Sequence, residues 1–94
     1  MADVIWGDVT QVIDGDTFDV TVTHYSRANE VQYNDRERIR IADIDAPELR
    51  SPFGQRAWHQ LERTLVGQHV RLEVQARDVY HRLVCRVSRV AKSA

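Results

Sequence analysis

The stretch 4–24, VIWGDVTQVIDGDTFDVTVTH, predicts two β-strands joined by a tight turn. Residues 4–13 are rich in β-branched side chains, and the Asp14-Gly15 pair that follows them is typical of a hairpin turn. Residues 16–24 alternate polar side chains with the apolar Phe18, Val20 and Val22. This alternation is typical of a strand with one buried face, so the whole stretch predicts a β-hairpin.

A third strand is predicted after the hairpin. Residues 25–36 are polar and are expected to form a loop or a second hairpin, with its turn near residues 27–29. Residues 37–44, ERIRIADI, again alternate polar and apolar side chains. They predict a strand that buries Ile39 and Ile41 and presents Arg38 and Arg40 on its other face.

One helix and two more strands complete the predicted order. Ser51-Pro52 is typical of a helix N-terminus, and Gly67 is a typical stop signal. Between them, apolar side chains recur at helical spacing, at Ala57, Trp58, Leu61 and Leu65. Beyond the helix, residues 69–75 and 82–90 are predicted strands, separated by a charged turn at 76–81.

Three strands, a helix and two strands are the element order of a five-stranded OB-fold barrel, which is mainly β with one helix (α+β class). An ordinary α+β sheet sandwich is the alternative. The 94 residues suit a single domain spanning residues 1–94. OB-fold barrels often bind oligonucleotides, but the fold alone does not establish a function.

Composition excludes several classes of protein. The chain is 43% hydrophobic and 29% charged, which is ordinary for a globular domain and unlike a disordered or fibrous one. No apolar run is long enough to span a membrane, and no signal peptide is evident, so the expected location is the cytoplasm. Cys85 is the one cysteine, which excludes an intrachain disulfide and a cysteine zinc cluster.

The two halves of the chain differ in charge. Residues 1–48 hold four arginines against eight aspartates and three glutamates, a net charge of −7. Residues 49–94 hold eight arginines and one lysine against three carboxylates, a net charge of +6. If the halves fold together, carboxylates and guanidinium groups can share one cleft, and the guanidinium fork suits phosphate. Solvated surface charge is the alternative interpretation.

Three short segments carry candidate functional residues. Asp16 opens the second predicted strand, Asp45 and Glu48 lie at the end of the third, and Arg82 ends the segment DVYHR at 78–82. Each segment alone is also explained as a polar turn or strand end. Arg40 and Asp45 are five residues apart and would face opposite sides of a regular strand, so a shared site requires a bulge or bend at residues 42–44.

Taken together, these segments resemble the staphylococcal nuclease (thermonuclease-like) family. The strings that carry the resemblance are IDGDT at 13–17, RIRIADIDAPE at 38–48, GQRA at 54–57 and DVYHR at 78–82. The resemblance spans about residues 9–90 and implies an OB-fold barrel. It further implies a nuclease that hydrolyses phosphodiester bonds in DNA and RNA and leaves 3′-phosphate ends.

The resemblance implies a calcium ion as cofactor. Asp16 and Asp45 match the family's calcium-binding aspartates, and the backbone carbonyl of Ala46 matches the ligand beside them. Calcium prefers several oxygen ligands of this kind. The substrate implied is nucleic acid, with single-stranded DNA or RNA preferred, and no membrane partner is expected.

The resemblance also implies the residues that act on the phosphate. Arg40 and Arg82 match the arginines that bind the scissile phosphate, and Glu48 matches the carboxylate that orients or deprotonates the attacking water. Tyr80 matches an aromatic side chain near the bound nucleotide. Charge placed around phosphorus favours the transition state over the ground state, which is the condition for catalysis.

Three departures from the family pattern affect these expectations. His81 replaces the usual glycine before Arg82, and Ala46 replaces a frequent threonine. The chain also lacks the C-terminal helices with which relatives continue, so apolar surface is expected at the barrel end, and a homodimer that covers it. The alternative function is a non-catalytic OB-fold module that binds single-stranded nucleic acid or a protein partner.

Overall fold

The computed structural model describes residues 3–91, and within them the chain forms five strands and one helix. The elements are β1 (Asp3–Asp14), β2 (Thr17–Tyr25), β3 (Arg36–Ile41), α1 (Pro52–Leu65), β4 (His69–Arg77) and β5 (Leu83–Arg89). This is the order predicted from the sequence. The largest difference in bounds is in β3, which ends at Ile41 and not at residue 44.

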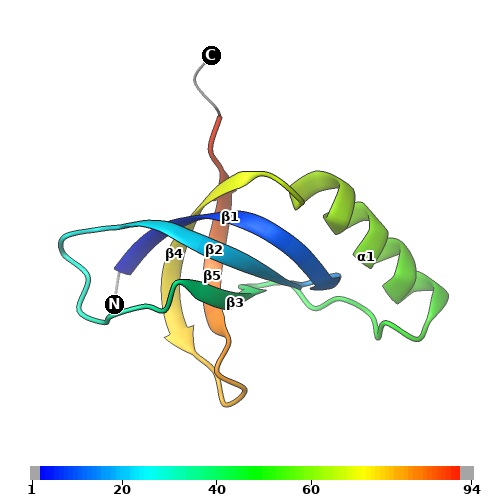
Figure 1. Ribbon diagram of the computed structural model, residues 1–94. Coiled ribbons are helices and arrows are strands. Elements are labelled where there is room, and N and C mark those ends of the chain that lie inside the picture. The colour runs from blue at the N-terminus through cyan, green and yellow to red at the C-terminus, as the bar shows by residue number, and fades with distance from the viewer. Residues whose placement is uncertain (1–2, 92–94) are drawn as a thin grey trace.

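The strands close into a barrel in the order β1-β2-β3-β5-β4 (Figure 1). The 12-residue strand β1 pairs with both β2 and β4, and its pairing with β2 contains three register shifts. Strand β5 pairs in parallel with β3 and antiparallel with β4, and so closes the barrel. The predicted OB-fold barrel is therefore confirmed, and the alternative sheet sandwich is wrong.

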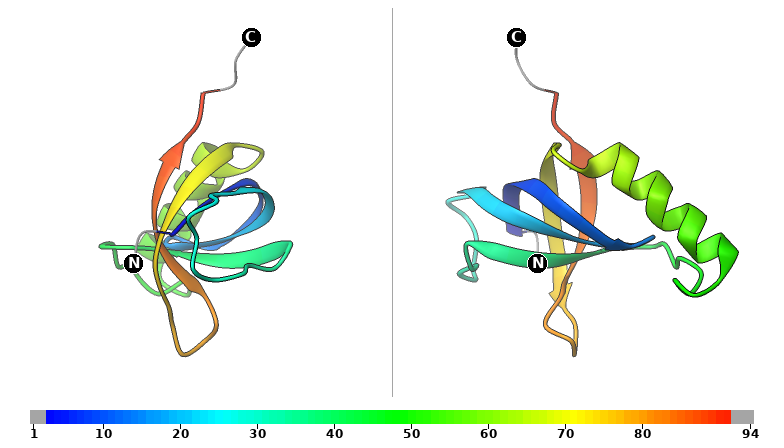
Figure 2. Two further views of the ribbon diagram at one scale, coloured as in Figure 1. Left: turned by 90° about the vertical axis from the view of Figure 1, so that its left-hand side faces the viewer. Right: turned by 45° about the vertical axis from the view of Figure 1, so that its right-hand side comes forward.

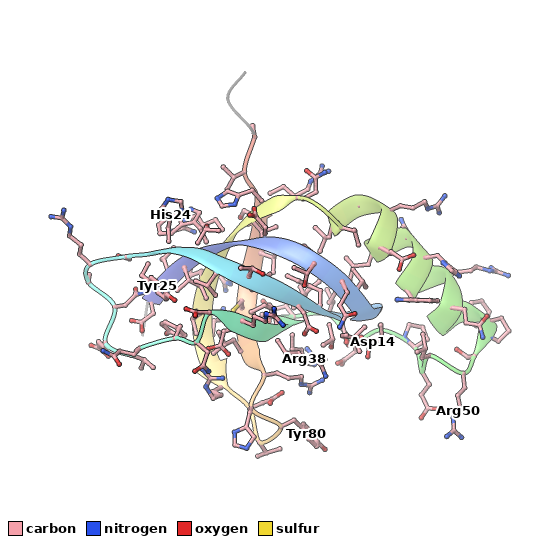
Figure 3. The ribbon with its side chains drawn as sticks, in the orientation of Figure 1. Asp14, His24, Tyr25, Arg38, Arg50 and Tyr80 are labelled. Carbon is pink, nitrogen blue, oxygen red and sulfur yellow. The ribbon has the colours of Figure 1, made fainter. Side chains whose placement is uncertain are left out.

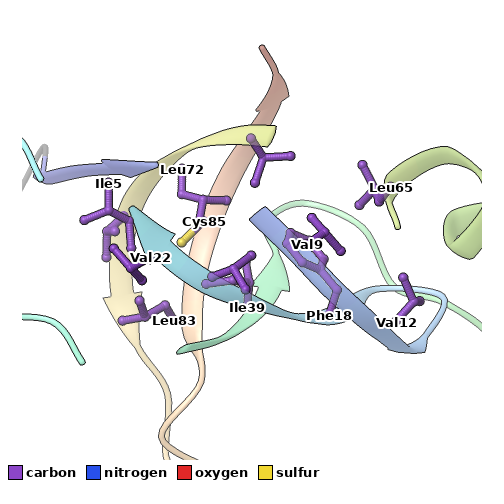
Figure 4. Packing of buried hydrophobic residues seen from close by; sticks show 13 residues of the cluster. Ile5, Val9, Val12, Phe18, Val22, Ile39, Leu65, Leu72, Leu83 and Cys85 are labelled. Carbon is purple, nitrogen blue, oxygen red and sulfur yellow. The ribbon is translucent and has the colours of Figure 1, made fainter. Parts of the chain in front are cut away.

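The barrel interior holds the apolar side chains that alternate along the strands (Figure 4). Phe18, Ile39 and Leu72 are fully buried there, each from a different strand. Cys85 lies in the same core, where burial raises the pKa of its thiol to about 12. Ile41, predicted to be buried, is partly buried and packs on the edge of this core.

Helix α1 lies beside the end of the barrel that carries the β1–β2 turn (Figures 1 and 2). The Ser51 hydroxyl accepts a hydrogen bond from the Gly54 N–H at 3.0 Å, and Pro52 opens the helix, as predicted. Trp58 Nε1 donates to the Val12 carbonyl at 2.9 Å, which joins the helix to β1. After the helix, Gly67 takes the left-handed conformation, with φ of 79°.

The β2–β3 connection is a long hairpin loop with a turn at residues 27–28, inside the range predicted. Asp3 of β1 is buried and holds this loop by accepting hydrogen bonds from three groups, the Glu30 and Val31 N–H groups and the Tyr33 hydroxyl. In residues 3–91, no helix combines the length and apolar character that a membrane crossing requires.

Candidate active site

The structure brings three of the predicted site residues into contact at the end of β3. Arg40 Nη2 hydrogen-bonds Asp45 Oδ1 and lies 3.6 Å from Asp16 Oδ2. Its other terminal nitrogen, Nη1, donates to the Ile41 carbonyl at 2.9 Å. Two carboxylates from different parts of the chain therefore converge on one guanidinium group. We call Asp16, Arg40 and Asp45 the carboxylate–arginine cluster.

The β1–β2 turn fixes Asp16 in this cluster. Asp16 accepts hydrogen bonds from the Thr17 hydroxyl at 2.9 Å and from the Ala46 N–H at 3.2 Å, and its own N–H donates to Asp14 at 3.0 Å. Burial raises the pKa of Asp16, but hydrogen bonds with Asp14, Ala46 and Thr17 and the charge of Arg40 lower it below the ordinary value. Asp16 is therefore held in its ionised form.

Asp14 is part of the site, although the sequence explained it as a turn residue. Burial raises the pKa of Asp14, and the neighbouring Asp16 carboxylate raises it further. The two aspartates are thus driven apart in pKa, Asp14 upward and Asp16 downward. The sequence does carry a signal for this contact, because Asp14 and Asp16 are two residues apart. At that spacing an aspartate side chain commonly accepts a hydrogen bond from the backbone N–H of the later residue.

A sharp bend after β3 lets Arg40 and Asp45 meet, although residues five apart would face opposite sides of a regular strand. The strand ends at Ile41, and Asp43 takes a left-handed conformation with φ of 67°. The Ala42 N–H donates to the Cys85 carbonyl at 2.8 Å, which fixes the start of the bend against β5. The bend predicted at residues 42–44 is confirmed, and it brings Asp45 back to the side of Arg40.

Close packing holds the loop that follows the bend. A Cβ atom on Gly15 would lie 2.7 Å from the Ala46 Cβ and 2.8 Å from the Ala57 Cβ. The β1–β2 turn, the loop and helix α1 therefore meet with no space for another carbon. The Ala46 N–H donates to Asp16 here, while the role that the family resemblance implies for its carbonyl, as a calcium ligand, stays a prediction.

Glu48 lies farther along the same loop, with its side chain exposed to solvent. Its carbonyl accepts hydrogen bonds from the Ser51 N–H at 3.0 Å and the Ser51 hydroxyl at 2.7 Å. A Cβ atom on Gly54 would lie 1.8 Å from that carbonyl oxygen, so the helix N-terminus passes directly over the Glu48 backbone. The backbone of Glu48 is therefore fixed, while its carboxylate remains free to contact solvent.

Arg82 and Tyr80 lie in the β4–β5 turn and form a separate group. Arg82 Nε donates to Asp78 Oδ2 at 2.7 Å, and Asp78 Oδ1 accepts the N–H groups of Tyr80 and Arg82, both at 2.9 Å. The Arg82 guanidinium carbon lies 5.1 Å from the centre of the Tyr80 ring, within cation–π range. Asp78 therefore fixes both the turn and the direction of Arg82.

His81 occupies this turn in a glycine-like conformation, with φ of 66°. Its carbonyl accepts a hydrogen bond from Arg77 Nη1 at 2.9 Å, and its N–H donates to the Asp78 carbonyl at 3.0 Å. Histidine in place of the usual glycine thus leaves the backbone in the left-handed region. The cost is the strain of a side chain at positive φ.

Arg82 lies immediately before β5, the strand that pairs with β3, and forms no ion pair with the cluster. Strands β3 and β5 are parallel, with Arg40 opposite Val84, so Arg82 precedes that position by two residues. Among the ion pairs of residues 3–91, Arg82 pairs with Asp78 and with none of the cluster residues. The structure therefore unites Asp16, Arg40 and Asp45, and places Arg82 and Tyr80 in a neighbouring turn.

The oxygen atoms that the cluster offers are of the kind that binds a hard cation. Asp16 and Asp45 offer carboxylate oxygens, the ligands that calcium prefers. Within residues 3–91, no three histidine, cysteine or acidic side chains are grouped as a ready metal cage. Both carboxylates face Arg40 Nη2, so a cation bound by both would compete with this guanidinium group.

Fold and site together define an OB-fold barrel with charged residues gathered at the end of its third strand. The model of the family "Staphylococcal nuclease homologue" matches residues 38–93, more than half of the chain. The chain belongs to this family, and the resemblance seen in its motifs is confirmed.

Three relatives show the extent of the likeness. "Protein ParB" of Escherichia coli is 38% identical over 78 residues, which cover 81% of this chain and 37% of that protein. "Micrococcal nuclease" of Shigella flexneri is 37% identical over 76 residues, covering 81% and 38%. "Probable endonuclease LCL3" of Arthroderma otae is 34% identical over 101 residues, covering 88% and 36%. The chain thus spans little more than a third of each relative's length.

Proposed function

We propose that this domain is a calcium-dependent nuclease that hydrolyses phosphodiester bonds in DNA and RNA and leaves 3′-phosphate ends. The observation that carries the proposal is the convergence of Asp16 and Asp45 on Arg40, in a chain of the staphylococcal nuclease family. Phosphoryl chemistry needs positive charge around phosphorus, and an arginine between two cation-binding carboxylates supplies the groups for it.

In this proposal, Asp16, Asp45 and the Ala46 carbonyl hold the calcium ion. When bound there, calcium adds positive charge beside the phosphate and helps to position or acidify a water molecule. The hydrogen bonds that keep Asp16 ionised support its role as a ligand. Asp45 is 93% exposed, so its carboxylate can turn from Arg40 toward a cation without loss of packing.

Arg40 and Arg82 bind the scissile phosphate in this proposal. Released from Asp45, the Arg40 guanidinium offers a planar pair of donors to phosphate oxygens. Arg82 is held by Asp78 and Tyr80 in the β4–β5 turn, two residues before the β5 position opposite Arg40. Both arginines stabilise the additional negative charge that develops during attack on phosphorus.

Glu48 and Tyr80 complete the proposed site. The exposed Glu48 carboxylate lies on the loop that also carries Asp45, where it orients or deprotonates the attacking water. Tyr80 is 74% exposed and offers its ring to a base or sugar of the substrate, with single-stranded DNA or RNA preferred.

A non-catalytic OB-fold module that binds single-stranded nucleic acid or a protein partner is the second candidate. The observation in its favour is the pairing of Arg82 with Asp78, which keeps this arginine out of the cluster.

We also propose that the protein forms a homodimer that covers the exposed end of the barrel. Ile44, Leu49 and Phe53 are exposed before and at the start of α1, and a monodisperse monomer in light scattering at high concentration would contradict the dimer.

The first experiment incubates a fluorescent single-stranded DNA with the protein, in calcium and in chelator. We expect calcium-dependent cutting that Glu48→Gln lowers by about 100-fold or more, because loss of a general base typically costs this much. Glu30→Gln is the matched control, since Glu30 is an exposed glutamate in the β2–β3 loop. Binding without cutting would overturn the nuclease and favour the binding module.

A further inference from the structure

The outer face of β3 carries arginine at three alternate positions, Arg36, Arg38 and Arg40. Glu37 and Ile39 between them are buried on the inner face. With a rise of about 3.3 Å per residue, neighbouring arginines of this row lie roughly 7 Å apart along the strand. That interval is comparable to the distance between successive phosphates of an extended single strand of nucleic acid.

A groove of about 690 Å³ lies over the same part of the sheet. Arg36 and Arg38 line it from β3, Gln11 and Asp19 line it from β1 and β2, and Tyr80 and His81 line it from the β4–β5 turn. Figure 3 shows Arg38 on the barrel surface and Tyr80 on the turn beside it. The row of arginines therefore leads from the carboxylate–arginine cluster into a polar groove with an exposed aromatic side chain.

Asp19 holds Arg38 in a geometry that phosphate can replace. Arg38 Nε and Nη2 donate to the two oxygens of Asp19 at 2.8 and 3.2 Å, and Gln11 donates to the same carboxylate at 2.8 Å. Such a fork matches phosphate as well as carboxylate. The pair is solvent-exposed on the arginine side, so exchanging one anion for another costs little.

We infer that single-stranded nucleic acid continues from the carboxylate–arginine cluster along this groove, with successive phosphates at Arg38 and Arg36. The inference rests on the proposed function for the position of the cleaved phosphate, and adds a binding track beyond it. Asp19 competes with the strand for Arg38, so it sets how tightly the track binds. The strand runs beside β3 toward Arg36, with Tyr80 as a stacking surface on the groove wall.

The test measures binding of fluorescein-labelled oligothymidylates by anisotropy, in chelator, at several salt concentrations. We expect Arg36→Gln and Arg38→Gln each to weaken binding of an octanucleotide and to reduce its salt slope by about 0.7, the value for one phosphate contact on a single strand. Binding of a dinucleotide is expected to stay unchanged. Asp19→Asn should tighten binding of the octanucleotide several-fold, since it removes the negative charge that competes with phosphate for Arg38.

Arg89→Gln is the matched control, because Arg89 is an exposed strand arginine outside the groove and its loss changes net charge equally. Equal salt slopes for the wild type and for both groove variants, or equal losses in Arg89→Gln, would overturn the inference.

Calcium-dependent cutting of the same oligonucleotides separates this inference from the proposed function. If the wild type shows no cutting, and the groove variants still lose octanucleotide binding, the proposed nuclease function is wrong and the binding track is supported. If the wild type cuts and the groove variants bind and cut octanucleotides normally, the track fails and the nuclease stands.

Discussion

At the scale of single residues, two glycines fix the loop that carries Asp45 and Glu48. Gly15 permits the β1–β2 turn to touch Ala46 and Ala57, and Gly54 permits the helix to pass over the Glu48 carbonyl. Gly54 lies in the first turn of a helix, where alanine ordinarily improves helix formation. Here the approach of the Glu48 carbonyl reverses that preference.

Gly54→Ala is therefore expected to destabilise the protein by about 1–3 kcal/mol, as overpacking commonly does. The added carbon displaces the Glu48 backbone, so the proposed nuclease activity should fall as well. Urea unfolding measures the first effect and cleavage of single-stranded DNA the second. Gln55→Ala, at the next and exposed position of the same helix, is the control and should stay within about 0.5 kcal/mol of the wild type. A Gly54→Ala variant as stable as the wild type would contradict the packing described.

At the scale of elements, Ser51 joins helix α1 to the loop before it through two different hydrogen bonds. Its hydroxyl accepts from the Gly54 N–H, which caps the helix, and donates to the Glu48 carbonyl, which holds the loop. An aspartate at the same position can accept but not donate when ionised. The two roles can thus be separated by substitution.

Ser51→Ala removes both bonds and should cost about 1 kcal/mol in the free energy of unfolding, with reduced activity. Ser51→Asp should restore the stability, because aspartate is an equally good helix cap, but not the activity. Thermal unfolding and cleavage assays on the same samples distinguish the two effects. Full activity in Ser51→Asp would show that the bond to the Glu48 carbonyl is not needed to position this loop.

At the scale of the whole molecule, buried Asp3 joins the N-terminal strand to the β2–β3 loop across the barrel surface. The Tyr33 hydroxyl and the Glu30 and Val31 N–H groups hold the pKa of Asp3 below its ordinary value, against the effect of burial. The ionised form is thus favoured by folding. Its contribution to stability is complete above the ordinary aspartate pKa of 3.8 and is lost as the pH falls below it.

Asp3→Asn is expected to destabilise the protein near neutral pH and to approach the wild type in stability as the pH falls below 3.8, the ordinary pKa of an aspartate. Urea unfolding at a series of pH values measures both curves. Asp35→Asn, an exposed aspartate of the same loop, should leave the curve of the wild type unchanged. Parallel curves for Asp3→Asn and the wild type through the acid range would rule out this role for Asp3.

The sequence predicted the barrel well because strand alternation and helix signals are local properties. It also predicted the bend after β3, since Arg40 and Asp45 could meet in no other way. It did not predict that β3 ends at Ile41, because Asp43 leaves the strand in a left-handed conformation that aspartate only sometimes adopts. The sequence also did not predict that Arg82 pairs with Asp78, since this contact depends on the shape of the β4–β5 turn.

The position of β5 in the barrel has a consequence for folding of the chain during its synthesis. β5 is synthesised after the other four barrel strands, yet it fits between β3 and β4 and closes the sheet. Until about residue 89 has emerged from the ribosome, a nascent chain presents two open strand edges to its surroundings. Those edges are where unfinished chains would pair with one another, so the interval between synthesis of β4 and of β5 is the one in which open edges favour aggregation.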